Sequence, residues 1–328
     1  MSPERVTDID RMIDYTCGGG KLLRGMLVVE AASLLVDAGD PDREVVVAQA
    51  QILGWCAELL QAYFLVIDDI LDESELRRGK PCWHRVPSVG PTNAICDGML
   101  LRSFVYRALE RWFLDSAHYV EFVGLFNLCT YATELGQAVD TDGVRAHHVS
   151  QFNMRRFQQI ARNKTAYYTY VLPLELALGV TGCLKRCDRA LLRRLCALMG
   201  EFYQAQNDML DFHSDARTTG KEGTDIAENK PTWLVATAME RARPEQWAVV
   251  AENYGRRDAP CVAAVRAVYE ALDVRRLFAA YARATEAAVR AMIAGLAQES
   301  PVVGRVCDLA WDKTRLAGAS LLEVADPP

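Results

Sequence analysis

The sequence contains two short acidic motifs that could bind a metal ion. Asp68 and Asp72 lie four residues apart, and Asp208 and Asp211 lie three residues apart, each pair at the end of a long apolar run. Residues three or four apart share one face of a helix, so each pair presents its carboxylates together. Gln61 extends the first face toward the start of its helix. Hard oxygen ligands suit Mg²⁺, which completes its shell with water and substrate phosphates.

The second acidic motif also carries carboxamides, from Gln204 and Asn207. One acidic motif alone is more often a solvated helix end with a C-cap than a metal site. Two such motifs, each followed by a loop with basic residues, favour two metal-binding walls over two ordinary helix ends.

Basic residues accompany both acidic motifs. Gly18, Gly19 and Gly20 precede Lys21 and Arg24 at the predicted start of a helix, where backbone N–H groups favour an anion. The remaining cations and one hydroxyl are Arg77, Arg78, Lys80, Lys164, Thr165, Lys221 and Lys230. Arginine binds phosphate through paired hydrogen bonds. Each basic group alone could be a solvated surface, but cations beside carboxylates predict a metal-bridged diphosphate.

The elements that must position these residues are helices. Apolar residues recur at helical spacing over most of the chain, and alternating strand patterns are scarce. We expect helices over residues 26–36, 48–71, 92–110, 119–139, 149–178, 189–212, 231–242, 244–254 and 262–296. No linker or low-complexity tract separates these helices. The sequence therefore predicts an all-α protein, with a single domain of about ten helices over residues 1–328.

The composition limits the partners of the protein. The chain has 328 residues, 51% hydrophobic and 24% charged, with a net charge of -6, which argues against non-specific nucleic-acid binding. We expect no membrane span, because no apolar run of about 18 residues lacks charge. Ten scattered cysteines without CxxC pairs argue against a zinc ribbon and indicate a reducing compartment. We expect a cytoplasmic protein, or one in a plastid or another organelle if a transit peptide has been removed.

Four stretches of the sequence, in this order, resemble motifs of the trans-prenyltransferases, the isoprenyl diphosphate synthases. They are GGGKLLRG (18–25), LLQAYFLVIDDILDESELRRGKPCW (59–83), NKTAYYTYVLPL (163–174) and GEFYQAQNDMLDFHSDARTTGKEGTDIAENKPTWLV (200–235). The resemblance is closest to eukaryotic farnesyl diphosphate synthases and extends from about Asp10 to about Trp311. It implies the type I isoprenoid synthase fold, in which mostly antiparallel helices surround a central cavity. It also implies prenyl diphosphates as substrates and a homodimer.

The resemblance further implies roles for individual residues. The metal set is Asp68, Asp72, Asn207, Asp208 and Asp211, which would bind Mg²⁺, three ions by similarity, or Mn²⁺. The set that neutralises the departing diphosphate is Arg77, Lys164 and Lys221. The set that holds isopentenyl diphosphate is Lys21, Arg24, Gln61 and Arg78. Residues beside the reacting groups or in the closing loop are Thr165, Tyr168, Tyr203, Gln204, Asp225 and Lys230.

The implied reaction joins an allylic diphosphate, dimethylallyl or geranyl, to isopentenyl diphosphate by ionisation, condensation and elimination. Tyr63 and Phe64 lie five and four residues before Asp68, about 6–7.5 Å down the helix. They would floor the pocket and limit the product to C15 or C10. The alternative is that both are ordinary core aromatics.

Asn207 departs from the family pattern, which has an aspartate at this position. An amide oxygen carries no charge, so we expect weaker binding of one metal ion. This change opens an alternative, in which the enzyme couples two dimethylallyl diphosphates irregularly or acts as a terpene synthase. A second alternative is a low-activity regulatory subunit of a prenyl synthase. The acidic end Glu323–Pro328 also differs from the basic tail of farnesyl diphosphate synthases.

Overall fold

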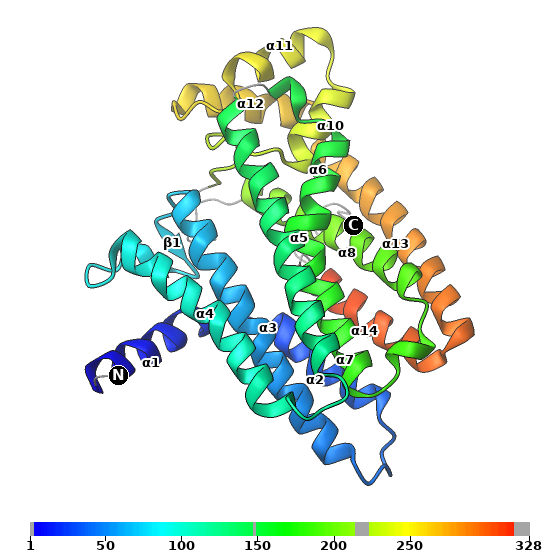
Figure 1. Cartoon of the computed structure of the whole chain (residues 1–328). Helices are drawn as coiled ribbons and strands as arrows, with labels where there is room; N and C mark the ends of the chain where they lie inside the picture. Colours follow the sequence, from blue (N-terminus) through cyan, green and yellow to red (C-terminus); the bar gives the residue numbers. More distant parts are fainter. Residues whose placement is uncertain (1–2, 147–148, 214–222, 318–328) are drawn as a thin grey trace. The chain divides into compact units, whose positions relative to one another are not determined.

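The protein is helical almost throughout, which confirms the predicted all-α fold class (Figure 1). A computed structural model describes residues 3–146, 149–213 and 223–317. The chain forms two compact units. Unit 1 comprises Met1–Tyr131, Tyr168–Arg189 and Glu299–Leu309, and unit 2 comprises Ala132–Tyr167, Ala190–Gln298 and Ala310–Pro328. Each unit is described by itself below, and the single-domain organisation stays a prediction.

The elements of unit 1 surround one long helix. They are α1 (Pro3–Cys17), α2 (Leu23–Leu35), α3 (Arg43–Leu71), β1 (Leu76–Arg77), β2 (Lys80–Pro81), the 3₁₀ turn η1 (Trp83–Arg85), α4 (Gly90–Phe113), α7 (Leu172–Val180) and the 3₁₀ turn η4 (Leu184–Arg186). Helix α3 packs against α2, α4 and α7. Its Ala- and Leu-rich sequence is apolar nearly all round, as expected of a helix buried on several sides.

Helix α3 also has the length and composition of a membrane-spanning helix, which qualifies the expectation of none. Its most apolar window has a mean hydropathy of 1.4. However, 56% of that window is buried inside the protein. The same pattern is therefore explained by a core helix, which α3 is in this structure.

Helices α2 and α3 approach each other unusually closely where two glycines meet. A Cβ atom on Gly54 would lie 2.8 Å from the backbone oxygen of Gly25. No side chain therefore fits between the two backbones at this crossing. The contact brings the start of α2 directly against the middle of α3.

A short hairpin follows α3, where the sequence predicted only a loop. Strand β1 pairs with β2 in antiparallel register, with Leu76 opposite Pro81. The two turn residues, Arg78 and Gly79, have φ angles of 53° and 73°. Positive φ at both central positions is the geometry of a type I′ hairpin turn, which matches the twist of the strands.

Two terminal helices were missed by the sequence analysis. Helix α1 contributes Met12 and Cys17 to a buried cluster with Trp83 and Leu101, so the polar sequence before the Gly-Lys motif does form a packed helix. Helix α14 (Pro301–Ala317) closes the described part of the chain. Both helices have enough polar residues to hide their apolar face from a simple count along the sequence.

Unit 2 contains most of the second half of the chain. Its elements are the 3₁₀ turn η2 (Val149–Gln151), α6 (Met154–Ile160), α8 (Arg189–His213), α10 (Trp233–Arg241), α11 (Pro244–Asn253), α12 (Ala259–Ala271) and α13 (Val274–Glu299). Helix α5 (Tyr119–Ala146), the π-helix η3 (Ala161–Val171) and α14 each run from one unit into the other. Phe202 of α8 stacks on Phe278 at 6.1 Å and contacts Trp311 at 5.2 Å, which centres the aromatic core of unit 2.

Two long predicted helices are in fact interrupted. The prediction of one helix over residues 262–296 was wrong, because Asp273 adopts a φ of 52° and ends α12. Its carboxylate then accepts a hydrogen bond from the backbone N–H of Arg276, in the first turn of α13, at 3.3 Å. The prediction over residues 149–178 missed the change from α6 to the π-helix η3 and back to α7. π-helical segments are rare and frequently occur at functional sites.

Candidate active site

The acidic end of α3 presents two carboxylates one turn apart. Asp72 is the C-cap, and its backbone N–H donates to the Asp68 backbone oxygen at 2.9 Å. The side chain of Asp68 is 20% exposed, and Asp72 is half-buried. Carboxylates at a helix C-terminus are opposed by the helix dipole, so this arrangement requires nearby positive charge.

Arg77 of the hairpin supplies that charge. Its guanidinium donates to Asp69 from Nε at 2.8 Å and from Nη2 at 2.6 Å, and Nη2 lies 3.6 Å from Asp68. Burial disfavours the charged form of Arg77, but the bond to Asp69 and the field of Asp68 outweigh it and raise the pKa of Arg77. Asp69 is therefore held closely by Arg77, which also forms a longer ion pair with Asp68.

Arg24 lies at the centre of a buried cluster in unit 1. Nη1 of Arg24 donates to Gln61 at 2.8 Å, and Nη2 donates to Thr169 at 2.8 Å. The guanidinium also lies 4.3 Å from the ring centre of Tyr168, a cation–π contact. The structure thus brings together three predicted site residues, Arg24, Gln61 and Tyr168. Thr169, which is fully buried, was not predicted.

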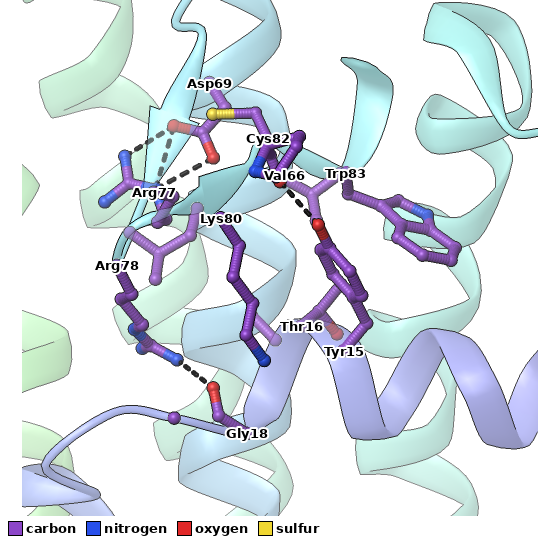
Figure 2. Close-up of a pocket in the computed structure, with 14 residues that line it drawn as sticks. Tyr15, Thr16, Gly18, Val66, Asp69, Arg77, Arg78, Lys80, Cys82 and Trp83 are labelled. Carbon is purple, nitrogen blue, oxygen red and sulfur yellow. Dashed lines mark hydrogen bonds and ion pairs between the residues drawn. The ribbon is translucent and has the colours of Figure 1, made fainter. Parts of the chain in front are cut away.

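Arg78 lies against the glycine-rich loop that precedes α2. Its Nη1 donates to the Gly18 backbone oxygen at 2.8 Å (Figure 2). A Cβ atom on Gly20 would lie 2.6 Å from the Arg78 guanidinium carbon, so the glycine is needed for this approach. Burial and the charge of Arg77 lower the pKa of Arg78. Lys21, in the same loop, is exposed.

Figure 2 shows a pocket on the adjacent face of α3. Arg77, Arg78 and Lys80 project from the hairpin along one side, and Tyr15 and Trp83 lie on the other. The hydroxyl of Tyr15 donates to the Pro81 backbone oxygen at 2.8 Å. This contact holds the hairpin against the end of α1. It therefore also holds the backbone of Arg77 and Arg78 in place.

The two predicted floor aromatics lie beside the Arg24 cluster. The ring of Phe64 meets the ring of Tyr168 edge-on at 5.2 Å, and the ring of Tyr63 lies 5.2 Å from that of Phe64. Both are partly buried. The row of rings forms an apolar wall next to a cation, which fits an apolar substrate chain with an anionic head.

In unit 2 the predicted lysines share one carboxylate. Lys164 Nζ lies 2.6 Å from Asp140 Oδ2, and Lys230 Nζ lies 3.4 Å from the same oxygen. Asp140 is buried and was not predicted, because its short Asp-Thr-Asp sequence lacks the spacing and the basic loop that mark the two acidic motifs. Lys230 is also fixed through its backbone oxygen, which accepts from the Tyr254 hydroxyl at 2.6 Å. Two predicted site lysines thus converge on one buried carboxylate.

A chain of hydrogen bonds runs through the second acidic motif. The Thr165 hydroxyl donates to Gln204 at 2.9 Å, and Gln204 donates to Asp208 Oδ1 at 2.9 Å. The other oxygen of Asp208 accepts from the Trp233 backbone N–H at 2.7 Å. Burial raises the pKa of Asp208 to about 7, against the lowering effect of these hydrogen bonds. Asp208 thus acts as an internal acceptor.

Asp211 is engaged with the backbone that follows the motif. Its two carboxylate oxygens accept from the backbone N–H groups of Thr224 and Asp225, each at 3.2 Å. Asn207 is exposed, and Tyr203 is half-buried. The prediction for Lys221 falls on residues 214–222, which lie outside the described part of the chain.

The two acidic motifs differ in how well they fit a divalent cation. Asp68 and Asp72 are accessible oxygen donors one turn apart, which fits Mg²⁺. The carboxylate oxygens of Asp208 and Asp211 accept hydrogen bonds from donors within the protein. Asn207 offers only a neutral oxygen. Within the described residues, no group of three or more His, Cys, Asp or Glu side chains is arranged to hold a metal ion. The first motif fits a metal, whereas the second fits one poorly as it stands.

The all-α fold presents an accessible acidic helix end, a basic hairpin and buried cations, which suit a protein that binds diphosphates. The polyprenyl synthetase family model matches residues 6–272 of this chain. The chain therefore belongs to this family, and it is a prenyltransferase by class.

Named relatives and solved structures agree on a narrower group. The chain is 39% identical over 280 residues to the farnesyl pyrophosphate synthase of Rattus norvegicus, a match that covers 85% of this chain and 79% of the relative. It is 42% identical over 277 residues to the mitochondrial farnesyl pyrophosphate synthase 1 of Arabidopsis thaliana, covering 83% and 71%. The structure of T. brucei farnesyl diphosphate synthase complexed with risedronate matches with a TM-score of 0.89 and 37% identity, covering 96% of this chain and 91% of that one.

Proposed function

We propose that this protein is a short-chain prenyl diphosphate synthase that condenses dimethylallyl or geranyl diphosphate with isopentenyl diphosphate to a C15 or C10 product. The observation that carries the proposal is the Arg24 cluster. Arg24 is 6% exposed and is aligned by Gln61, Thr169 and Tyr168. A buried, oriented cation beside aromatic rings suits a second diphosphate substrate, which the regular reaction requires and which ionisation of an allylic substrate alone does not.

In the proposed reaction, different residues of the chain would stabilise the leaving group and protect the allylic cation. Arg77 and Lys164 would neutralise the departing diphosphate, and Lys221 and Lys230 would add to that charge. Mg²⁺ at Asp68 and Asp72 would supply further positive charge to the leaving group. The rings of Phe64 and Tyr168 would exclude water from the allylic cation that forms. The double bond of isopentenyl diphosphate then attacks this cation, and the tertiary cation that results loses a proton from its neighbouring carbon to the released diphosphate.

Three further properties belong to the same proposal. We infer that the two acidic motifs serve one reaction within a single functional domain. We infer a homodimer as the active form, with no nucleic-acid partner. We place the protein in a reducing compartment, the cytoplasm or an organelle, because all ten cysteines are free thiols.

The deciding experiment is a product assay on the purified full chain with Mg²⁺. Three reactions are compared: dimethylallyl diphosphate alone, dimethylallyl with isopentenyl diphosphate, and geranyl with isopentenyl diphosphate. Products are dephosphorylated and identified by mass spectrometry. Farnesol or geraniol that forms only when isopentenyl diphosphate is present is the expected result.

Other products would point to the alternatives. Asn207 is the observation that favours irregular coupling or terpene synthesis, since it removes one charge from the second motif. An irregular alcohol or a hydrocarbon from dimethylallyl diphosphate alone would therefore replace the proposal. No product from folded protein would indicate a regulatory subunit. An Arg24→Met variant separates condensation from terpene synthesis, because it should lose any coupling that needs a second diphosphate and keep a reaction of one allylic diphosphate alone.

A further inference from the structure

Glu58 is a buried carboxylate beneath the basic cluster of unit 1, and no role for it follows from the acidic motifs. Its side chain is 4% exposed. Oε1 accepts a hydrogen bond from the backbone N–H of Gly25 at 2.8 Å. Glu58 lies on α3, and Gly25 lies in the first turn of α2. The bond therefore connects the middle of one helix to the start of another.

The first turn of α2 has no local cap. Its N-cap residue, Leu22, adopts a φ of 46° and provides no side-chain hydrogen bond. The first N–H groups of a helix lack intrahelical partners and need an acceptor from elsewhere. Glu58 provides that acceptor from a different helix, and its negative charge also suits the positive end of the α2 dipole.

The two glycines described above make this contact possible. A Cβ atom on Gly25 would lie 3.0 Å from Glu58 Cγ and 3.0 Å from the Gly54 backbone oxygen. Gly54 and Glu58 are one turn apart on α3, so the close crossing and the carboxylate belong to the same face. Glycine at both positions therefore allows this acceptor to lie directly under α2.

Gln61, on the same side of α3, binds the residue next to Gly25. Gln61 accepts from Arg24 Nη1 at 2.8 Å, while Glu58 accepts from Gly25 N. Glu58 and Gln61 thus hold two consecutive residues of α2, one by its side chain and the other by its backbone. The position of Arg24 then depends on both bonds.

The charge of Glu58 also acts on Arg78, the arginine in the turn of the hairpin. Burial and Arg77 lower the pKa of Arg78, and Glu58 opposes them. Glu58 therefore lies close enough to act on Arg78 as well as on the start of α2. Glu58 is thus a buried negative charge close to Arg24 and Arg78, which would otherwise repel each other when no substrate is bound.

We propose that Glu58 is a positioning residue for the isopentenyl diphosphate site, which it sets by fixing the first turn of α2 and with it Arg24. Glu58 itself is buried under the helix turn, so we expect it to act through Arg24 and not by contact with the substrate. The inference rests on the proposed function, because it assigns Arg24 to the second diphosphate. The inference distinguishes the two substrate sites. The proposed allylic site depends on Asp68, Asp72 and Arg77, which Glu58 does not contact, so changes at Glu58 should affect isopentenyl diphosphate alone.

Three substitutions separate the hydrogen bond from the charge. Glu58→Gln keeps an oxygen at the same reach and removes the charge. Glu58→Asp keeps the charge and withdraws the oxygen by about 1.5 Å, one carbon–carbon bond. Glu58→Ala removes both. Glu44→Gln, at an exposed position in the first turn of α3, is the matched control.

Steady-state kinetics with both substrates varied give the first readout. We expect Glu58→Asp and Glu58→Ala to raise KM for isopentenyl diphosphate by roughly tenfold, the loss expected when about 1.4 kcal/mol of orientation is removed. KM for the allylic substrate should stay within about twofold, and Glu58→Gln, which keeps the acceptor and loses only the charge, should raise KM for isopentenyl diphosphate by less than Glu58→Asp does. An equal rise in both KM values, or a Gln variant as defective as the Asp variant, would overturn the proposal.

Calorimetric binding of isopentenyl diphosphate to the same proteins separates this inference from the proposed function. If the wild-type protein has no turnover, the proposed function fails, but weaker binding in Glu58→Asp than in Glu58→Gln would still support the positioning role. Equal binding by the wild type and all three variants would refute it. If the Ala variant does not fold, the Gln and Asp pair carries the whole test.

Discussion

At the scale of single residues, the structure assigns different tasks to carboxylates that look alike in sequence. Asp68 and Asp72 are accessible, but Asp69 between them is 4% exposed and bound to Arg77. Asp208 and Asp211 satisfy internal donors. Spacing alone gave the shared face of Asp68 and Asp72 correctly. It could not give the partners, because those come from a hairpin and from loops distant in sequence.

The Asp69–Arg77 pair should contribute measurably to stability. We expect Asp69→Asn to lower the free energy of unfolding by about 2 kcal/mol. Breaking a buried ion pair costs more, but Arg77 is 33% exposed and water screens it. Urea denaturation measures the change. Glu75→Gln on the same hairpin breaks an exposed pair with Arg85 and should change nothing measurable; an equal loss in both variants would contradict a special role for Asp69.

Asn207 should limit the affinity for metal. We expect Asn207→Asp to lower the Mg²⁺ concentration for half-maximal turnover by roughly tenfold, because an exposed position next to Asp208 gains a charged ligand. A Mg²⁺ titration of the condensation rate measures this. Gln298→Glu adds the same charge at the exposed end of α13 and should leave the titration unchanged. An unaltered curve for Asn207→Asp would show that this position does not contact the metal.

His84 should make unit 1 less stable in acid. The side chain is buried, and burial together with Arg85 lowers its pKa. The unfolded chain therefore binds a proton at a higher pH than the folded chain does. Stability from this group is complete above the ordinary imidazole pKa of about 6.5 and falls as the pH drops through that value. Urea midpoints from about pH 7.5 to about pH 5.5 should fall less for His84→Gln than for the wild type; parallel curves would reject this source.

At the scale of elements, two glycines clamp the π-helix that carries Lys164 and Thr165. A Cβ atom on Gly136 of α5 would lie 2.3 Å from the Lys164 backbone nitrogen. A Cβ atom on Gly200 of α8 would lie 2.3 Å from the Ala166 Cβ. The π-helix is thus packed backbone to backbone on two helices. This packing is a rigid support for Lys164, which we propose neutralises the leaving group.

Gly136→Ala should therefore displace the Lys164 segment. We expect a loss of about 2 kcal/mol in stability, typical of overpacking, and a marked fall in kcat. Gly124→Ala on the same helix is the control, since nothing lies within 4 Å of its Cβ position. That change should instead stabilise α5 by a few tenths to about 1 kcal/mol, through helix propensity. Thermal unfolding and turnover of both variants measure these effects. Similar behaviour of the two variants would show that Gly136 is not required for the packing of the π-helix.

The helices that were predicted and those that were missed differ for physical reasons. Apolar periodicity located α3, α4, α5 and α8, because these helices bury a broad face. It missed the ends of the chain and the break at Asp273, because single-residue backbone choices such as a positive φ leave no periodic signal. The requirement for glycine at position 136 depends on the backbone of Lys164, which no local pattern reveals.

At the scale of the whole molecule, the fold and family follow from the sequence, whereas the assembly does not. Four ordered motifs are enough to identify a polyprenyl synthetase, because together they set charged and polar residues at characteristic spacings along most of the chain. Asp68 and Asp72, the proposed metal ligands, could be singled out from their spacing alone. Asp140, Thr169 and Glu58 could not, since each becomes functional only through a partner from another helix.

The expected homodimer is the last property that the molecule allows us to test. Helices α4 and α5 carry large apolar side chains exposed to solvent, including Met99 at 59%, Trp112 at 60% and Tyr131 at 63%. Exposed apolar surface of this kind often marks a protein interface, and most soluble oligomers are symmetric dimers. We expect sedimentation velocity to show a dimer at micromolar concentration. The double variant Met99→Glu, Tyr131→Glu should shift the protein to monomer, because charge in an apolar interface is costly to bury. Val45→Glu, exposed on α3 at 57%, should remain dimeric. A monomeric wild type, or a double variant that stays dimeric, would show that these two helices do not form the interface.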